Sequence, residues 1–311
     1  MHDRSGNRDD NAMKYATARN FRAAIDARLK AYTLSDDPRL LVQIRKQITF
    51  DRFLARLLTV SPDAWLLKGG TALQYRLGEA SRFTKDLDLV LFSGSDFASD
   101  EISKAVAYDA NDFFSFSLQQ SRLLDHSTEG SSRRFMLRAE LDGRLFENII
   151  VDVGFDDPSP LPTGMIPGTN FLEFAGISAI SPPILPIEVH LSEKLHALAR
   201  IYEGNRQSTR VKDLIDIVLI ARAYRLNANS VRLALNHTFH SRAVHPLPVR
   251  LGVPPAEWSV PYVALAVSVN LDPDMSIGHA FAASLLDPLL GGELAETAVW
   301  NPATCAWTEQ G

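Results

Sequence analysis

Two short stretches decide the fold of this chain: Lys68–Leu73, which reads Lys-Gly-Gly-Thr-Ala-Leu, and Thr84–Leu89, which reads Thr-Lys-Asp-Leu-Asp-Leu. Gly69 and Gly70 have no Cβ atom, so the backbone can turn tightly there and come close to a ligand. A helix that begins at Thr71 would direct free backbone N–H groups and a partial positive charge toward this turn. The first stretch therefore predicts a phosphate-binding turn at the start of a helix.

The second stretch predicts a strand that carries two carboxylates on one face. Side chains alternate along a strand, so Asp86 and Asp88 point the same way, with Cα atoms ~6–7 Å apart. Leu87, Leu89 and Leu91 fill the opposite face. An Asp-x-Asp pattern alone is also common on an ordinary solvent-facing strand. Beside a phosphate-binding turn, however, two converging carboxylates can hold one or two magnesium ions, and the combination indicates nucleotidyl or phosphoryl transfer.

Composition limits the classes to which the protein can belong. The chain has 311 residues, enough for one large domain or two moderate ones, and its apolar fraction of 46% supports a sizeable core. The single cysteine, Cys305, excludes an internal disulfide and a cysteine zinc cluster and fits a cytoplasmic location. The sequence contains no run of ~20 apolar residues, so no membrane-spanning helix is predicted. The net charge of −5 argues against a generic nucleic-acid coat protein, although a local basic strip could still bind RNA.

Hydrophobic periodicity predicts an α/β fold. Residues 1–12 are expected to form a disordered leader, residues 13–186 a sheet with flanking helices, and residues 187–311 a mostly helical domain. Asp142 and Gly143 predict a tight hairpin turn between two strands. The predicted helices cover residues 15–32, 39–58, 71–77, 101–114, 211–224, 260–267 and 280–286, and the predicted strands cover residues 65–67, 86–92, 135–139 and 146–155.

The order of these motifs resembles the nucleotidyltransferase signature of the DNA polymerase beta superfamily, in which Gly-Gly or Gly-Ser precedes Asp-x-Asp. The wording KGGTAL followed by RFTKDLDL resembles the AbiEii/AbiGii toxin family, which includes MenT-like toxins. Fifteen residues separate Gly70 from Asp86, slightly more than is usual in the superfamily. The resemblance extends from about Trp65 to Trp258. It implies a polymerase beta-like mixed sheet with flanking helices, and a nucleotide bound between this sheet and the helical domain.

The resemblance also implies a third acid on a neighbouring strand. Asp152 interrupts the apolar run 149–153, and an acid in such a strand is costly to bury unless it is paired or binds a metal. It could also simply face outward on an edge strand. By resemblance, Asp86, Asp88 and Asp152 would hold Mg²⁺, with Mn²⁺ as a substitute. Asp152 would also activate the attacking hydroxyl.

Five residues are predicted to contact the nucleotide near the turn. By resemblance, the backbone of Gly69, Gly70 and Thr71 and the Thr71 hydroxyl would hold the β- and γ-phosphates. Lys68, which precedes them, is either structural or a further phosphate contact. Thr84 could bond the substrate or cap its strand. The alternative for the whole group is a plain strand-to-helix turn with an N-cap.

A second set of candidate catalytic residues lies in the helical part. Lys194 matches the family pattern Glu-Lys-Leu-x-Ala-Leu, which places the lysine at the triphosphate, although a lysine at this edge of a helix usually reaches toward solvent. Asp213 and Asp216 lie on an apolar helix and need partners, for which Lys194, Arg210 and Lys212 are available. The two acids either pin two helices together, or one of them orients Lys194 or contacts the nucleotide.

The resemblance implies a toxin of a toxin–antitoxin or phage-defence system. It would transfer a nucleoside monophosphate from an NTP to RNA, with the tRNA 3′ end as acceptor, and an antitoxin encoded nearby would be its partner. Arg133, Arg134 and Arg138 could form a basic strip for the RNA or an ordinary solvated cluster. Two alternatives remain: transfer to a protein or small-molecule hydroxyl, and nucleotide binding without turnover.

Overall fold

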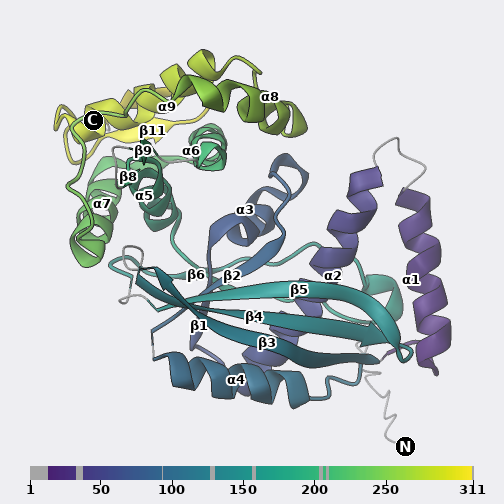
Figure 1. Ribbon diagram of the computed structural model, residues 1–311. Helices are drawn as coiled ribbons and strands as arrows, with labels where there is room; N and C mark the ends of the chain where they lie inside the picture. Colours follow the sequence, from purple (N-terminus) through teal and green to yellow (C-terminus); the bar gives the residue numbers. More distant parts are fainter. Residues whose placement is uncertain are drawn as a thin grey trace, which may run out of the picture.

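A seven-stranded mixed sheet forms the centre of the N-terminal part of the protein (Figure 1). The computed structural model describes residues 13–32, 38–92, 94–126, 130–155, 159–202, 206–207 and 210–309, so the predicted leader lies outside the described residues. The strand order is β3-β4-β5-β2-β1-β7-β6. The strands are β1 (Trp65–Leu67), β2 (Asp86–Leu91), β3 (Phe114–His126), β4 (Gly130–Leu141), β5 (Arg144–Phe155), β6 (Gly164–Met165) and β7 (Pro183–Ile184).

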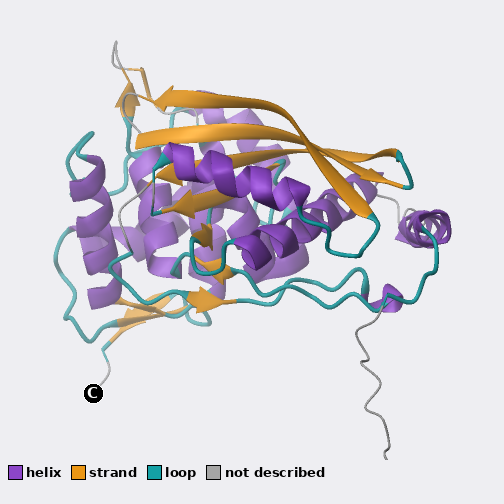
Figure 2. Ribbon diagram, turned by 90° about the horizontal axis from the view of Figure 1, so that it is seen from below, coloured by secondary structure: helices purple, strands orange, loops and turns teal. Residues whose placement is uncertain are grey.

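The strand pairing confirms the mixed sheet. β2 pairs with β1 in the antiparallel sense and with β5 in the parallel sense, and β5 continues into the antiparallel meander of β4 and β3. These three long strands run side by side in both views (Figure 1 and Figure 2). The predicted hairpin turn is also confirmed, because Asp142 and Gly143 both have positive φ and join β4 to β5.

Helices cover the apolar face of the sheet. Leu87, Leu89 and Val151 alternate with the acids, and they pack against α2 (Pro38–Val60) and α4 (Ser95–Ala107) in one core. That core also includes residues of α1 (Ala18–Tyr32) and of α3 (Gly69–Leu77), which follows β1. Figure 1 shows α4 below the sheet and α3 above it, on the side of the C-terminal helices. The face of the sheet that carries the carboxylates is therefore on the side of α3.

The C-terminal half has its own apolar core and is mostly helical, as predicted. Leu73 of α3 joins this core, which links it to the sheet, and the domain boundary at residue 186 stays a prediction. No helix in the described part of the chain has the length and apolar character needed to cross a membrane. The elements are α5 (Ile187–Leu198), β8 (Ile201–Tyr202), β9 (Arg206–Gln207), α6 (Val211–Ala223), β10 (Leu226–Asn227), α7 (Ala228–Arg242), α8 (Ser259–Ser268), α9 (Met275–Leu290), β11 (Val299–Asn301) and β12 (Ala306–Thr308), with short 3-10 turns at Gly78–Ala80, Glu173–Ala175 and Ala256–Trp258.

The prediction of a helix over residues 101–114 was wrong at its C-terminal end. The helix ends at Ala107, and Phe114 begins β3. Asn111 and Phe113 have positive φ, which a helix does not allow. Between them, Asp112 is buried and forms two hydrogen bonds with the Arg56 guanidinium, at 2.9 and 2.6 Å. This ion pair with α2 fixes the turn, and a local apolar pattern does not reveal it.

A buried carboxyl between α2 and α3 should make stability depend on pH. Burial raises the pKa of Asp51 to about 7, although hydrogen bonds from Tyr75 and Gln47 act in the opposite direction. Above about pH 4 the folded state therefore keeps a proton that the unfolded state has lost, so this contribution to the free energy of unfolding is lost as the pH rises toward 7. We expect the stability advantage of Asp51→Asn over the unmutated protein to grow by about 2 kcal/mol between about pH 5 and pH 7 in urea unfolding. An advantage that does not change with pH would contradict this assignment.

Candidate active site

The glycine turn lies directly against one of the two carboxylates of β2. Gly69 has φ +61°, and a Cβ atom placed on it would lie 2.1 Å from Oδ2 of Asp88. The backbone N–H of Gly70 donates a hydrogen bond to the same oxygen, at 3.2 Å. A helix N-terminus stabilises negative charge, and here that charge includes Asp88. The helix begins at Gly69 and not at Thr71 as predicted, so both glycines belong to its first turn.

Replacing Gly69 by alanine should impair both the fold and the site. The positive φ alone costs about 1 kcal/mol for a residue with a Cβ atom, and the contact with Asp88 adds displacement of that carboxylate. Gly78 is the matched control, because its φ is +55° and a Cβ atom there meets nothing within 4 Å. We expect Gly69→Ala to lose at least ~100-fold in transfer rate and Gly78→Ala to lose only stability, measured by initial rates and thermal melting. Equal rates in the two variants would show that the turn does not position Asp88.

Three carboxylates meet on one face of the sheet. Asp88 on β2 is directly opposite Asp152 on β5, and Asp86 lies one step earlier, opposite Ile150. Burial raises the pKa of Asp88 to about 6, and repulsion from Asp152 and Asp86 adds to this while the Lys194 ammonium opposes it. Burial also raises the pKa of Asp86, with repulsion from Asp152 as the next cause. Burial is the main cause, so ionisation of both acids is less favourable in the folded protein than in water.

Asp152 already has a partner that the sequence did not suggest. Arg134 on β4 donates to both of its oxygens, from Nε at 2.7 Å and from NH2 at 2.6 Å. Among the described residues, no group of three or more His, Cys, Asp or Glu side chains is arranged to hold a metal ion. Asp86 and Asp88 still fit magnesium, which is usually bound by one or two carboxylates together with substrate phosphates and water. The predicted metal role of Asp152 stays a prediction, and it would require Arg134 to yield at least one oxygen.

Two threonines hold the strand that carries the acids. The Thr71 hydroxyl is buried and donates to the carbonyl oxygen of Asp86 at 2.7 Å, and the Thr84 hydroxyl donates to the same atom at 3.3 Å. Both hydroxyls therefore fix the backbone at Asp86. Their predicted contacts with phosphate or substrate stay predictions.

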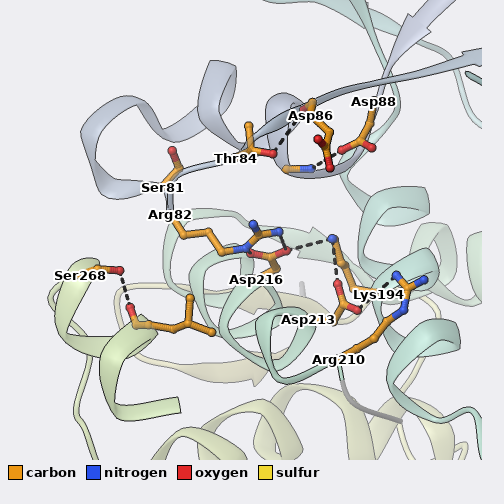
Figure 3. Close-up of polar contacts among 12 residues, drawn as sticks. Ser81, Arg82, Thr84, Asp86, Asp88, Lys194, Arg210, Asp213, Asp216 and Ser268 are labelled. Carbon is orange, nitrogen blue, oxygen red and sulfur yellow. Dashed lines mark hydrogen bonds and ion pairs between the residues drawn. The ribbon is translucent and has the colours of Figure 1, made fainter. Parts of the chain in front are cut away.

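Lys194 is buried between two aspartates and does not reach toward solvent (Figure 3). Its Nζ lies 2.9 Å from Oδ1 of Asp213 and 2.9 Å from Oδ2 of Asp216. Burial alone would lower the pKa of Lys194, but the two aspartates raise it above its ordinary value. Its charge is therefore permanent, and it acts on Asp88 across the site.

Arg82 is the residue of this cluster that sequence reasoning missed. Its guanidinium donates to both oxygens of Asp216, from Nε and NH2 at 2.7 Å each. Burial would raise the pKa of Asp216, but Lys194 and Arg82 hold it well below its ordinary value. One signal was available: Arg82 begins the RFTKDLDL stretch, and a buried acid needs a cation. Lys212, one of the three cations predicted as partners of Asp213 and Asp216, is exposed.

The two aspartates of α6 differ in how completely they are bonded. Both oxygens of Asp216 accept hydrogen bonds. Oδ2 of Asp213 is buried and accepts none from the described residues, although NH1 of Arg210 lies 3.8 Å away. Asp216 is thus a fixed link between α6 and the β2 side of the site, whereas Asp213 retains bonding capacity.

Lys68 is also tied into the helical part. Its Nζ lies 3.7 Å from Oε1 of Glu193 on α5, and Arg242 of α7 donates a hydrogen bond to the same oxygen. Lys68 therefore links the glycine turn to two C-terminal helices. The sequence left two roles open for Lys68, a structural one and a contact with phosphate. The contact with Glu193 is a structural role, and the contact with phosphate stays a prediction.

A glycine turn at a helix start, beside paired aspartates on a mixed sheet, defines a nucleotidyltransferase. The family described as "Nucleotidyl transferase AbiEii toxin, Type IV TA system" matches residues 52–283. That is well over half of the chain. The chain belongs to the AbiEii family of nucleotidyltransferase toxins of type IV toxin–antitoxin systems. As members of this class do, it uses an NTP and a divalent metal ion, and its system includes an antitoxin.

Two solved structures are similar to this chain. The nucleotidyltransferase toxin MenT4 of Mycobacterium tuberculosis aligns with a TM-score of 0.57 and 18% identity, covering 88% of this chain and 90% of MenT4. JHP933 of Helicobacter pylori aligns with a TM-score of 0.42 and 17% identity, covering 83% of this chain and 94% of JHP933. No curated protein matched the chain by sequence. At these identities the MenT4 alignment supports the fold alone.

Proposed function

We propose that this nucleotidyltransferase toxin transfers a nucleoside monophosphate from an NTP to the 3′ hydroxyl of an RNA, with tRNA as the acceptor and Mg²⁺ as the metal ion. The observation that carries the proposal is the contact between the N-terminus of α3 and Asp88. It places the anion-binding end of a helix beside two carboxylates whose ionisation is made less favourable by burial and by repulsion between the acids. A triphosphate with its cation supplies the complementary charges. The cytoplasm, where NTPs and tRNA are found, is the compartment that this reaction requires.

Asp86 and Asp88 would hold the metal ion, with Mn²⁺ as an accepted substitute, and Asp152 would be a shared ligand if Arg134 yields. When bound, the ion neutralises phosphate charge and polarises the α-phosphate. The N–H groups of the first turn of α3, at Gly69, Gly70 and Thr71, bind and orient the outer phosphates, and the N–H of Gly70 exchanges Asp88 Oδ2 for a phosphate oxygen.

Asp152 lies across from Asp88 and accepts the proton of the acceptor hydroxyl. The hydroxyl oxygen forms the new bond to the α-phosphorus, and the bond from that phosphorus to pyrophosphate breaks. The proton leaves with Asp152, and pyrophosphate carries away the negative charge.

Lys194 supplies fixed positive charge on the other side of the site. Its charge already lowers the pKa of Asp88, so the same field favours the triphosphate. Asp213 is the acid suited to exchange partners when nucleotide binds, because Oδ2 accepts no hydrogen bond from the described residues. Asp216 and Arg82 hold Lys194 in place and are positioning residues.

Labelling with each α-³²P-NTP, magnesium and total tRNA tests this proposal, with Asp86→Ala as the control. We expect label in tRNA with one or more NTPs for the unmutated protein and none for the variant. Label in a protein or a small molecule would keep the reaction and overturn the acceptor. NTP binding without label in any acceptor would overturn the enzyme and favour a nucleotide-binding module.

A further inference from the structure

The catalytic carboxylates continue into a row of arginines across the sheet. The strand register places one residue from each of four neighbouring strands in line: Asp88 on β2, Asp152 on β5, Arg134 on β4 and Arg122 on β3. Residues directly opposite each other on paired strands have side chains on the same face. Neighbouring strands lie about 4.8 Å apart, so Arg134 and Arg122 are about 5 and 10 Å from the position of Asp152 along the row.

The row leads from the buried site to an open edge. Asp152 and Arg134 are about one quarter exposed, at 22% and 26%, whereas Arg122 is exposed on β3, the edge strand of the sheet. Arg122 forms no hydrogen bond or ion pair with any described residue. Met136, two residues beyond Arg134 on the same face, is 41% exposed. This face therefore offers charge and apolar surface that the described residues leave uncovered.

The charges of the row identify its occupant. Carboxylates lie at one end, where metal-bound phosphate would be, and guanidinium groups lie at the other, beyond the acid that faces the acceptor hydroxyl. Arginine pairs with phosphate through its planar fork of donors. A strand of RNA that ends at Asp152 and runs along the sheet toward β3 would place its preceding phosphates at Arg134 and Arg122.

We propose that Arg134 and Arg122 bind the backbone phosphates of the acceptor RNA and so direct its 3′ hydroxyl to Asp152. This inference rests on the proposed function. Arg134 has a second role, because it holds Asp152 through both oxygens when no acceptor is bound. Arg122 has no such role, so its contribution is to acceptor binding alone.

The sequence left two alternatives for Arg133, Arg134 and Arg138, a basic strip or an ordinary solvated cluster, and the strand geometry separates the three side chains. Arg133 is adjacent to Arg134 on β4 and so points to the opposite face, where NH1 donates to Ser121 Oγ at 3.2 Å. Arg138 shares the face of Arg134 but donates to Glu140 Oε1 at 2.7 Å. Arg122, which was not predicted, completes the row.

Arg122→Glu tests the proposal, with Arg133→Glu as the control of equal charge change. We expect Arg122→Glu to raise the KM for tRNA at least ~10-fold and to leave the KM for NTP within about twofold. For Arg122→Ala, tRNA binding followed by fluorescence anisotropy should lose about 0.7 from its slope against log salt, the value for one phosphate contact in a single strand. Arg133→Glu should change the KM for tRNA less than about twofold.

Equal effects of Arg122→Glu and Arg133→Glu would show that Arg122 does not bind RNA phosphates in the proposed way. Such a result would leave the proposed function intact. An unchanged KM for tRNA in both variants, while the unmutated protein labels tRNA, would have the same two consequences. If the unmutated protein labels a protein substrate and no RNA, the proposed acceptor fails, and the RNA row fails with it. Thermal melting checks that Arg122→Glu is folded. We expect it to be folded because Arg122 forms no hydrogen bond or ion pair with any described residue.

Discussion

Asp88→Asn should lower the rate of nucleotidyl transfer by about 10³-fold and should at the same time make the metal-free protein more stable. The loss of about 4 kcal/mol in transition-state stabilisation follows from removing one of the two carboxylates that we propose as ligands of the metal ion. The gain follows from the pKa of Asp88, which burial raises to about 6. Ionisation of Asp88 at neutral pH is therefore less favourable in the folded protein than in the unfolded chain, and a neutral amide removes this cost.

The sign of the stability change follows from proton linkage. A carboxyl with a raised pKa stabilises the fold at pH values below its unfolded value of 3.8, and this contribution is lost as the pH rises through about 6. In EDTA at about pH 7.5, Asp88→Asn should be more stable by about 1–2 kcal/mol in urea unfolding. Asp100 is an exposed acid on α4, so Asp100→Asn should change neither the transfer rate nor the free energy of unfolding. A stable Asp88→Asn variant with full activity would remove Asp88 from the site.

Asp216→Ala should destabilise the protein by about 3–5 kcal/mol, the largest effect on stability that we expect from a single polar substitution here. Asp216 is fully buried and neutralises Arg82 and Lys194, which are themselves buried. Removing the carboxylate leaves two cations in a region of low dielectric, where Asp213 still pairs with Lys194 but no carboxylate bonds the Arg82 guanidinium. Urea unfolding measures the loss directly.

Asp26→Ala is the matched control, because Asp26 also faces two arginines. Arg22 and Arg45 lie 3.7 and 3.8 Å from its oxygens, but its side chain is 42% exposed. Solvent screens such pairs, so the expected cost is below about 1 kcal/mol. Similar losses in Asp26→Ala and Asp216→Ala would show that burial of the Lys194 cluster contributes little.

The sequence was sufficient where the chemistry is local. The period of two along 86–91 predicts that Asp86 and Asp88 share a face, and the strand β2 has this alternation. A helix is present at the glycine pair as expected, although α3 begins at Gly69 and not at Thr71, and the hairpin at Asp142 follows from turn chemistry. The mixture of parallel and antiparallel strands in the sheet was predicted from the family resemblance and not from hydrophobic periodicity.

The remainder depends on contacts between distant parts of the chain. Arg134 meets Asp152 only because β4 pairs with β5 in one particular register, and Arg122 joins them through the pairing of β3 with β4. A shift of one residue would move every side chain to the other face. Arg82 and Asp216 lie far apart in sequence and meet only when α6 packs near β2. The three-stranded sheet of β10, β11 and β12 was not predicted, because its strands are only two or three residues long.

Transfer to the 3′ hydroxyl of tRNA is tested most directly by comparing intact tRNA with tRNA whose terminal ribose has been oxidised by periodate. Each RNA is incubated with the protein, magnesium and the α-³²P-NTPs. We expect label on intact tRNA and none on oxidised tRNA, because the attacking group in the proposed reaction is the 3′ hydroxyl. Asp88→Asn should give no label on either RNA. Equal label on both RNAs, or label that persists in Asp88→Asn, would contradict transfer to the 3′ end through this carboxylate site.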